Sequence, residues 1–397
     1  MMKQYNFNLQ YPKPLLDNEY SDLLKIAKSG LFSRYSSDYV DSLEQKLAKY
    51  YQTDYAITCT SGTAALHGCL VALDFKPGSE VITTSVADIG IIIPIIYENL
   101  VPVFSDIDFE SFNITADMVL EKITKKTKAV IAVHLAGNPC DLDELSKLCK
   151  SKNITLIEDF SQAHGAKWGN KKIGSFGSIS YGSFQQSKQI TCGEGGVIVT
   201  SDKNLRRRAF IGVDKAWQRE LPLEKRKYEF LAPNLRFNAL QAAVLTPQLE
   251  RLDSVIARKR RIAEKISKKL APFDSFIKTQ KIYNKGFHSY YSFPLIAKDN
   301  LFRDNIVDLL NDEYNMYCAK GYANPVPLYQ CVNALKNPKK YGKGLIYSKN
   351  EYPKGLCPEA EDLLKKSFLI PFNENYNDDE INDISERLKS AIKKLTA

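Results

Sequence analysis

The sequence has 397 residues, which is more than one compact core usually supports, so two structural units or one large domain with an appendage are expected. A content of 44% hydrophobic and 25% charged residues is typical of a soluble globular protein. No run approaches the ~18 apolar residues that span a bilayer, so we expect no membrane segment.

The N-terminal sequence and the cysteines indicate a reducing compartment. The stretch M-M-K-Q-Y-N-F-N-L-Q lacks the apolar core of ~7–15 residues and the small-residue cleavage site of a secretory signal. The eight cysteines are scattered without a C-x-x-C pair, which disfavours both a zinc site and a disulfide framework. We therefore expect a cytoplasmic protein without a bound structural metal.

The chain begins with an arm and helical segments over residues 1–55 and then changes character at Tyr55. From there, short β-rich runs follow one another, and we predict strands at Tyr55–Thr58, Glu80–Thr84, Val101–Phe104, Ala129–His134, Thr155–Glu158, Ile179–Phe184 and Val197–Thr200. Helical patterns separate several of them, at Ala64–Leu73, Thr115–Ile123 and Asp141–Ser151. This alternation predicts an α/β unit with a mostly parallel sheet, whose ligands bind beyond the carboxyl ends of the strands.

A long helical stretch after Arg236 leads into a smaller C-terminal unit. We expect a strand at Ser289–Pro294 and a terminal helix at Asp378–Leu395, which together indicate an α+β unit. The predicted division is a large domain at 1–250, including the arm, and a small domain with its connecting helix at 251–397.

The net charge of +9 includes a dense basic group, which raises the question of nucleic acid binding. This group lies on a helical repeat whose apolar stripe is Leu249, Leu252, Ile256, Ile262 and Ile266. A solvated helix face is therefore the favoured interpretation of Arg258, Lys259, Arg260 and Arg261, with no nucleic acid partner. Attraction of an anionic substrate is a milder alternative.

The first motif that indicates chemistry is T-C-T-S-G-T-A-A-L at 58–66, which follows a strand and opens a helix. Its small residues allow close backbone approach, and free N–H groups at a helix start suit a phosphate. An ordinary helix cap is the alternative interpretation. Neither G-x-G-x-x-G nor G-x-x-x-x-G-K-[ST] occurs, which argues against a dinucleotide or P-loop site.

The second motif, I-E-D-F-S-Q-A-H-G-A, places Asp159 at the end of a predicted strand. A carboxylate there can pair with the protonated ring nitrogen of a bound pyridine cofactor. Alternatively, it caps the turn that follows the strand. Gln162 and His164 are candidates for contacts with the ring oxygen of such a cofactor or with the substrate, although a single histidine more often has a structural role.

The third motif is S-F-Q-Q-S-K-Q-I-T-C-G-E-G-G at 183–196, with Lys188 between two small-residue turns. A lysine held in a desolvated pocket can form a Schiff base with an aldehyde, above all with pyridoxal phosphate, whereas most lysines are simply solvated. Ser183 ends a strand and can add a phosphate contact. The three motifs occur in the order phosphate cradle, pyridine carboxylate and Schiff-base lysine, each at a strand end.

Together with N-L-R-F-N-A-L-Q-A-A at 234–243, these motifs resemble the DegT/DnrJ/EryC1/StrS family of pyridoxal-phosphate sugar aminotransferases. The similarity covers most of the chain, including the arm and the P-F-N at Pro371. It implies the aspartate aminotransferase-like fold type I and a homodimer whose cofactor pockets lie at the subunit interface.

The resemblance also implies roles for individual residues. Lys188 would form the Schiff base with pyridoxal 5'-phosphate and later move a proton between the substrate carbon and the cofactor. Asp159 would pair with the pyridine nitrogen, and Gln162 would lie near the ring hydroxyl. The phosphate would be held by residues of both subunits, namely Gly62, Thr63 and Ser183 with Asn234 of the partner subunit.

Two features depart from the usual pattern of that family. Asp88 stands where the family usually places an aromatic ring that stacks on the cofactor, and a carboxylate cannot stack. Gln185 and Gln186 resemble the ketocyclitol aminotransferase branch more than the nucleotide-sugar members. We therefore expect Asp88, His164 and Gln186 among the substrate contacts.

The leading hypothesis is an aminotransferase that moves an amino group from glutamate or glutamine to a keto or aldehyde group of an oxidised sugar or cyclitol. The acceptor would be a nucleotide-linked sugar, a ketocyclitol or an acidic octulosonate, for cell-surface polysaccharide, such as lipopolysaccharide, or for a secondary metabolite. One alternative is a sugar dehydratase of the same fold, which carries histidine in place of the lysine. Another is a non-catalytic regulatory protein on this scaffold.

Overall fold

The computed structural model describes residues 2–6, 12–341 and 345–396. Its main feature is a seven-stranded sheet in the order β2-β10-β9-β6-β5-β3-β4. The strands are β2 (Tyr55–Cys59), β3 (Glu80–Thr84), β4 (Val101–Ser105), β5 (Thr127–Val133), β6 (Thr155–Asp159), β9 (Ile179–Ser183) and β10 (Gly196–Thr200). The pairings from β9 to β4 are parallel, whereas β10 is antiparallel to β9 and β2. The prediction of an α/β unit with a mostly parallel sheet is confirmed.

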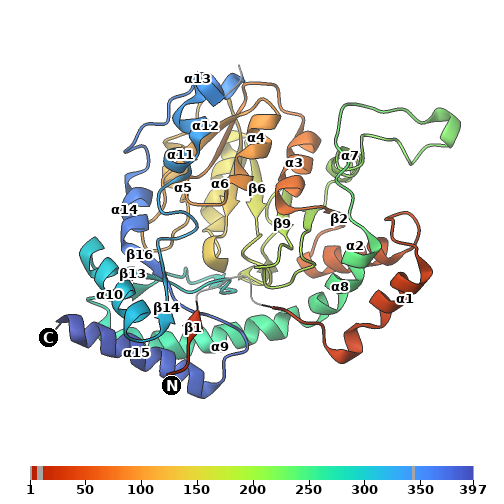
Figure 1. Cartoon of the computed structure of the whole chain (residues 1–397). Helices are drawn as coiled ribbons and strands as arrows, with labels where there is room; N and C mark the ends of the chain where they lie inside the picture. Colours follow the sequence, from red (N-terminus) through yellow and green to blue (C-terminus); the bar gives the residue numbers. More distant parts are fainter. Residues whose placement is uncertain (1, 7–11, 342–344, 397) are drawn as a thin grey trace.

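Helices cover both faces of this sheet (Figure 1). They are α2 (Tyr39–Tyr51), α3 (Gly62–Leu73), α4 (Ile93–Tyr97), α5 (Ala116–Leu120), α6 (Leu142–Lys152) and α7 (Lys203–Gly212). Local chemistry determines where they begin, because the side chains of Ser61, Asp141 and Asp202 accept backbone N–H groups of the first turns of α3, α6 and α7. Left-handed Asp74 and Asn153 end α3 and α6.

The strand directions bring the three motifs to one edge of the sheet. Strands β2, β5, β6 and β9 all run the same way, so their carboxyl ends meet there. The register places Cys59 and Ser183 opposite Gly196 on either side of β10, and Asp159 opposite Tyr181. Topology therefore assembles at one place residues that lie more than a hundred positions apart.

Helices α8 (Ala239–Glu250) and α9 (Leu252–Leu270) lead into a second core. It is built on an antiparallel sheet in the order β11-β13-β16-β15, comprising β11 (Ile277–Thr279), β13 (Pro294–Ala297), β16 (Ser367–Leu369) and β15 (Ala319–Lys320). Helices α10 (Asn300–Asp312) and α15 (Asp378–Thr396) pack with α9 around this core. The smaller α+β unit and its terminal helix are as expected.

The apolar stripe predicted along α8 and α9 is fully buried. The solvated basic face is only partly correct, because Lys259 is 4% exposed. Its position on α9 turns the side chain inward, where Phe372 and Glu374 pack against it.

Chain segments cross between the two cores. Strand β1 (Tyr5–Asn6) of the arm pairs with β14 (Met316–Tyr317), and Tyr5 packs in the second core. The stretch with α11 (Leu328–Cys331), α12 (Asn333–Lys336), α13 (Pro338–Tyr341) and α14 (Pro358–Lys366) returns to the first, where apolar side chains of α11, α12 and α14 are buried. A small sheet of β7 (Lys167–Trp168), β8 (Lys171–Lys172) and β12 (Gly286–Phe287) joins the units, and α1 (Ser21–Ser29) packs on α8.

The predicted strand at Ser289–Pro294 is wrong, because strand β13 begins only at Pro294. Tyr290 has a φ of +50°, which interrupts an extended run. The N–H groups of Ser289 and Tyr291 bond instead to the carbonyls of Gly137 and Ala136. This loop is held against the large unit and does not form a longer strand.

Two features are missing from the part of the chain that the structure describes. None of its helices is both long and apolar enough to cross a membrane. Within the same residues, no group of three or more His, Cys, Asp or Glu side chains is arranged to hold a metal ion.

Candidate active site

A cavity of about 580 Å³ opens at the carboxyl edge of the large sheet. Its lining includes residues from all three sequence motifs, namely Gly62, Thr63, Asp159, Gln162, Ser183 and Lys188, together with Asp88. The structure therefore brings together most of the residues that the sequence singled out. Tyr181, Tyr291 and Tyr322 also line the cavity and were not among the predicted site residues.

The start of α3 forms a narrow cradle at one end of the cavity. Ser61 caps the helix, and Gly62 faces the end of β9 so closely that a Cβ atom there would stand 2.8 Å from the Cβ of Ser183. A Cβ on Gly196 would come within 2.1 Å of the Ser61 carbonyl oxygen. Glycine at both positions allows backbone N–H groups and the Ser183 hydroxyl to face one small volume, which suits an anion.

The Asp159 carboxylate is held by a donor on each oxygen. Oδ1 accepts the backbone N–H of Ser161 at 2.9 Å, and Oδ2 accepts the Tyr181 hydroxyl at 2.7 Å. Burial, and then the negative charge of Asp159, raise the pKa of Tyr181 well above its ordinary value, so this hydroxyl stays a donor. The carboxylate is therefore fixed in direction while it remains open to the cavity.

The loop that carries Lys188 is held on several sides. The Lys188 N–H donates to the Gln185 carbonyl at 2.9 Å, and the Lys188 carbonyl accepts a hydrogen bond from the ammonium of Lys13. Ser187 Oγ lies 2.9 Å from the hydroxyl of Tyr291. The Lys188 Nζ stands 4.8 Å from the centroid of the Tyr291 ring, within the range of a cation–π contact.

Gln162 is oriented by one donor from the large unit and one from the C-terminal part of the chain. Its Oε1 accepts the Ala136 N–H at 2.8 Å and the Tyr322 hydroxyl at 2.5 Å. Tyr322 is 3% exposed and burial raises its pKa, so it acts as a donor. Tyr291 and Tyr322 could not be found from periodicity, because they lie in irregular segments far along the chain from the motifs that they meet. The only local signal was the aromatic run at Tyr290 and Tyr291.

Three predicted residues are not among the described residues that line the cavity: His164, Gln186 and Asn234. His164 is fully buried, with Nε2 at 2.7 Å from the Ser183 carbonyl oxygen and Nδ1 at 2.6 Å from the Tyr51 hydroxyl. Burial lowers its pKa to about 3, so it is a neutral support behind β9. This position does not support the expected substrate contact. Asn234 is exposed and bridges to Asp214, away from the cavity of its own chain.

Asp88 lies at the rim, where its Oδ1 accepts the Gly90 N–H at 2.8 Å. A Cβ on Gly90 would stand 2.5 Å from Thr63 Oγ1, so Asp88 and Thr63 flank the same glycine. Among the described lining residues, the acidic ones are Asp88, Asp159 and Glu194, and the basic one is Lys188. The cavity of one chain is therefore acidic overall, in contrast to the basic C-terminal unit.

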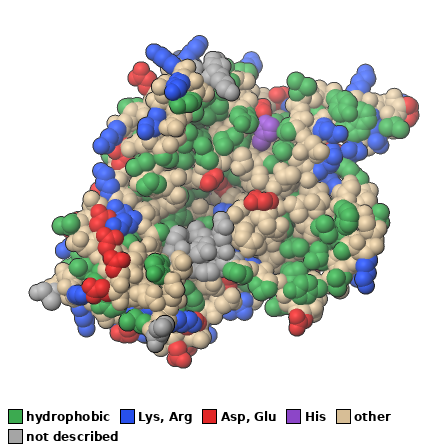
Figure 2. All heavy atoms as spheres, in the orientation of Figure 1, with side chains coloured by type: hydrophobic (Ala, Val, Ile, Leu, Met, Phe, Trp, Pro, Cys, Tyr) green, Lys and Arg blue, Asp and Glu red, His purple; other side chains and the backbone are tan. Residues whose placement is uncertain are grey.

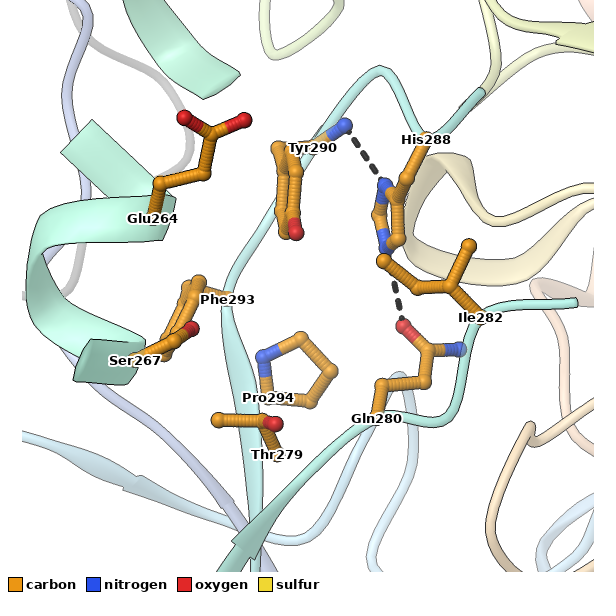
Figure 3. A pocket seen from close by; sticks show the side chains of 9 residues that line it. All are labelled: Glu264, Ser267, Thr279, Gln280, Ile282, His288, Tyr290, Phe293 and Pro294. Carbon is orange, nitrogen blue, oxygen red and sulfur yellow. Dashed lines mark hydrogen bonds between the residues drawn. The ribbon is translucent and has the colours of Figure 1, made fainter. Parts of the chain in front are cut away.

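A second hollow, of about 380 Å³, lies between α9 and the segment 279–294 (Figure 3). It is lined mainly by apolar and aromatic side chains around His288 and Tyr290, whose rings stack at 3.9 Å. His288 is satisfied there, with Nε2 at 3.1 Å from Gln280 Oε1 and Nδ1 accepting the Tyr290 N–H at 2.8 Å. None of the motif residues faces this hollow, so the first cavity is the candidate active site.

The chain is similar over most of its length to proteins of one known family. The model of the DegT/DnrJ/EryC1/StrS aminotransferase family matches residues 15–389. GDP-perosamine synthase of Escherichia coli O157:H7 is 36% identical over 278 residues, which cover 70% of this chain and 74% of that protein. The X-ray structure of an aminotransferase from Psychrobacter cryohalolentis is similar with a TM-score of 0.88 at 26% identity, covering 98% of this chain and 100% of that one. The E. coli GDP-4-keto-6-deoxy-D-mannose-3-dehydratase with bound hydrated pyridoxal phosphate has a TM-score of 0.83 at 27% identity, covering 98% of this chain and 100% of that one.

Proposed function

This chain belongs to the DegT/DnrJ/EryC1/StrS aminotransferase family, and we propose that it moves an amino group from glutamate or glutamine to the keto or aldehyde group of an oxidised sugar or cyclitol. It has the fold type I architecture of pyridoxal-phosphate enzymes, and its cofactor is pyridoxal phosphate. One observation carries the proposal: Lys188, Asp159 and the start of α3 line a single cavity.

The residues of the cavity fit this cofactor. When bound, pyridoxal phosphate supplies a carbonyl carbon that accepts amines and a pyridine ring that withdraws electrons from the reacting carbon. The glycine cradle at Gly62, the Thr63 N–H and the Ser183 hydroxyl would hold the phosphate, because they face one volume that no Cβ fills. At the other end, Asp159 would hold a proton on the pyridine nitrogen.

We assign the acid–base work to Lys188. Its Nζ would bind the carbonyl carbon of the cofactor and, once an incoming amine frees it, take and return the proton of the reacting carbon. The Tyr291 ring below Nζ and the anchored backbone of the loop would keep that nitrogen directed into the cavity. Gln162, fixed by Tyr322, would donate its amide to the ring oxygen of the cofactor.

We propose that the acceptor places its reacting carbonyl in the cavity and that it carries no acidic group next to that carbonyl. Asp88 and Glu194 would repel a carboxylate there, which favours a nucleotide-linked sugar or a ketocyclitol over an acidic octulosonate. The phosphates of a nucleotide-linked sugar would then lie outside the rim. The similarity to GDP-perosamine synthase supports a nucleotide-linked sugar. We place the reaction in the biosynthesis of cell-surface polysaccharide as part of the same proposal. A cytoplasmic location is part of the same proposal.

A homodimer with shared active sites completes the proposal. The hairpin 214–236 projects from the body beyond α7 (Figure 1), and Asn234 lies on it. Apolar side chains gather on this hairpin and over α1 (Figure 2), including Leu223 and Leu231 on the first, and Leu24 on the second. Such exposed apolar surface suits a subunit interface. Asn234 of the partner subunit would then reach the phosphate end of the cavity.

Buried Asp214 holds the base of that hairpin. It pairs with Arg219 Nε and Arg236 Nη1 at 2.5 Å each, and it also accepts the Tyr35 hydroxyl. Burial favours the neutral acid, but these hydrogen bonds outweigh it and lower the pKa of Asp214. The hairpin is therefore presented in one orientation, as an arm that inserts into a partner would need.

The test of function follows nitrogen from donor to product. The protein is incubated with GDP-4-keto-6-deoxy-D-mannose, the sugar named for the similar dehydratase, and with glutamate or glutamine carrying ¹⁵N on the transferred amino group. We expect mass spectrometry to find ¹⁵N in an amino sugar for wild type, and none for Lys188→Ala. A dehydrated sugar without ¹⁵N would favour the dehydratase instead. A cofactor that stays attached to Lys188→Ala after borohydride reduction would show that the lysine is wrongly assigned.

The test of shared sites uses subunit exchange. Lys188→Ala and Asn234→Ala each damage one contribution, so in a mixed dimer one site regains both native residues. About a quarter of wild-type activity is expected after random exchange of equal amounts, since half of the dimers carry one intact site. Activity no higher than the average of the two separate variants would contradict the shared site.

A further inference from the structure

Beneath the Lys188 loop, three charged side chains from distant parts of the chain share one buried place. Lys13 comes from the arm, Lys259 from α9, and Glu374 from the segment after β16. We propose that Lys13 is a positioning residue that fixes the backbone of Lys188 and thereby the direction of its side chain. The inference rests on the proposed role of Lys188.

The contact between Lys13 and Lys188 is direct. The Lys13 ammonium donates to the Lys188 carbonyl, and the Lys188 N–H is already bonded to the Gln185 carbonyl. Both backbone groups of Lys188 therefore have a partner, one within its own loop and the other on the arm. The hydrogen bond to the Lys188 carbonyl limits rotation of the peptide that follows Lys188, and with it the conformational freedom of the Lys188 side chain.

Glu374 favours the charged form of the Lys13 ammonium in this buried cluster. Its carboxylate lies 3.9 Å from Lys13 Nζ and 3.3 Å from Lys259 Nζ, and the Lys13 and Glu374 side chains are only 10% and 12% exposed. Burial lowers the pKa of Lys13 to about 8, helped by Lys259, Lys188 and Arg251 and opposed by Glu374. Lys13 is thus still mainly charged at neutral pH, which makes the hydrogen bond to the carbonyl charge-assisted.

The arm does not need Lys13 to stay in place. Arg251 holds it independently, because Nη2 bonds to the Pro14 carbonyl at 3.4 Å and Nε pairs with Glu19 at 2.9 Å. These contacts anchor the chain on either side of the turn after Lys13. The Lys13 side chain therefore has two specific contacts, a hydrogen bond to the Lys188 loop and an ion pair with Glu374.

Lys259 provides a matched control within the same cluster. It pairs with the same carboxylate and is even less exposed, with 5% of its side chain accessible. Its ammonium lies 4.7 Å from the centroid of the Phe372 ring, and no hydrogen bond from it to the Lys188 loop occurs among the described residues. Lys13→Met and Lys259→Met each remove one buried ammonium from Glu374, but only the first removes the donor to Lys188.

The experiment compares amide hydrogen exchange over residues 185–192 in the full-length protein without added cofactor. We expect exchange in Lys13→Met to be about tenfold faster than in wild type, because a charge-assisted hydrogen bond that limits local opening is lost. Lys259→Met should stay within about twofold in this segment, although both variants lower overall stability. Lys13→Arg, which keeps a charged donor, should restore most of the protection.

Kinetics with cofactor give a second readout. Lys13→Met should lower kcat with little change in the KM of the acceptor, because Lys13 does not line the substrate cavity. If Lys13→Met does not fold, Lys13→Met/Glu374→Gln removes both charges and is compared with Glu374→Gln alone. Equal acceleration in the Lys13 and Lys259 variants, or none in the Lys13 variant, would overturn the proposal. If the wild-type protein transfers no amino group, the proposed function fails, whereas the exchange result still decides whether Lys13 holds the loop.

Discussion

Replacing Gly62 with alanine is the sharpest test of the cradle at the start of α3. The added Cβ would stand 2.8 Å from Ser183 Cβ, and since ordinary contacts begin near 3.4 Å, α3 and β9 must separate by about 0.6 Å. That exceeds the ~0.5 Å within which a binding site must be held. Loss of one hydrogen bond to a charged phosphate is worth ~1.5–3 kcal/mol, so cofactor affinity should fall about 10- to 150-fold.

The matched control is Gly68→Ala on the same helix. There a Cβ would meet Ile198 Cδ1 at 2.6 Å and Val213 Cγ1 at 2.9 Å, away from the cavity. Overpacking of this kind costs ~1–3 kcal/mol, so both variants should unfold at a lower temperature. Pyridoxal phosphate binding is measured by absorbance titration of protein freed of cofactor. Weakening by Gly62→Ala that is no greater than that by Gly68→Ala would refute the assignment of the cradle.

Three further outcomes are expected. Opposing burial, Lys259 and Lys13 lower the pKa of Glu374 from 4.5 to about 2, so the stability it contributes is complete above pH 4.5 and is lost as the pH falls toward 2. The free energy of unfolding, measured with urea, should therefore fall less for Glu374→Gln than for wild type between pH 4.5 and 2, by on the order of 1–3 kcal/mol. Burial lowers the pKa of His164 from 6.5 to about 3, so between these pH values the histidine is protonated in the unfolded chain and neutral in the folded one. The free energy of unfolding of wild type should therefore decrease relative to that of His164→Gln as the pH falls below 6.5. Cys331 is the exposed cysteine of the described chain, so Cys331→Ser should remove the fast phase of thiol modification by a disulfide reagent, and a fast phase that persists would contradict its assignment.

The acidic rim at Asp88 and Glu194 bears on how substrate would be selected. A basic C-terminal unit suggests an anionic substrate, yet within one chain the basic side chains of α9 do not line the cavity. Lys259 is directed into the protein, and Arg261 and Lys265 pair with Asp378 on the surface. Net charge therefore describes the unit as a whole, whereas the proposed selection at the reacting carbon would depend on the few charges at the rim.

Local sequence by itself determined the sheet and the place of the site. Apolar alternation, capping residues and glycine turns act over a few positions, so the ends of α3 and of the strands of the large sheet could be predicted to within about two residues. Parallel strand order then required Gly62, Asp159 and Lys188 to meet at one edge, because each lies at or after the carboxyl end of a strand, and these strands run in the same direction.

Only the tertiary structure decided which side chains complete that site. Tyr291 and Tyr322 reach it from irregular segments, and Lys13 of the arm contacts the Lys188 backbone behind it. No local period connects these residues to Lys188 or Gln162. The same holds for His164, whose motif places it near the site but whose packing behind β9 buries it. Contacts between distant segments depend on how the two cores pack together, and this packing leaves no periodic signal in the sequence.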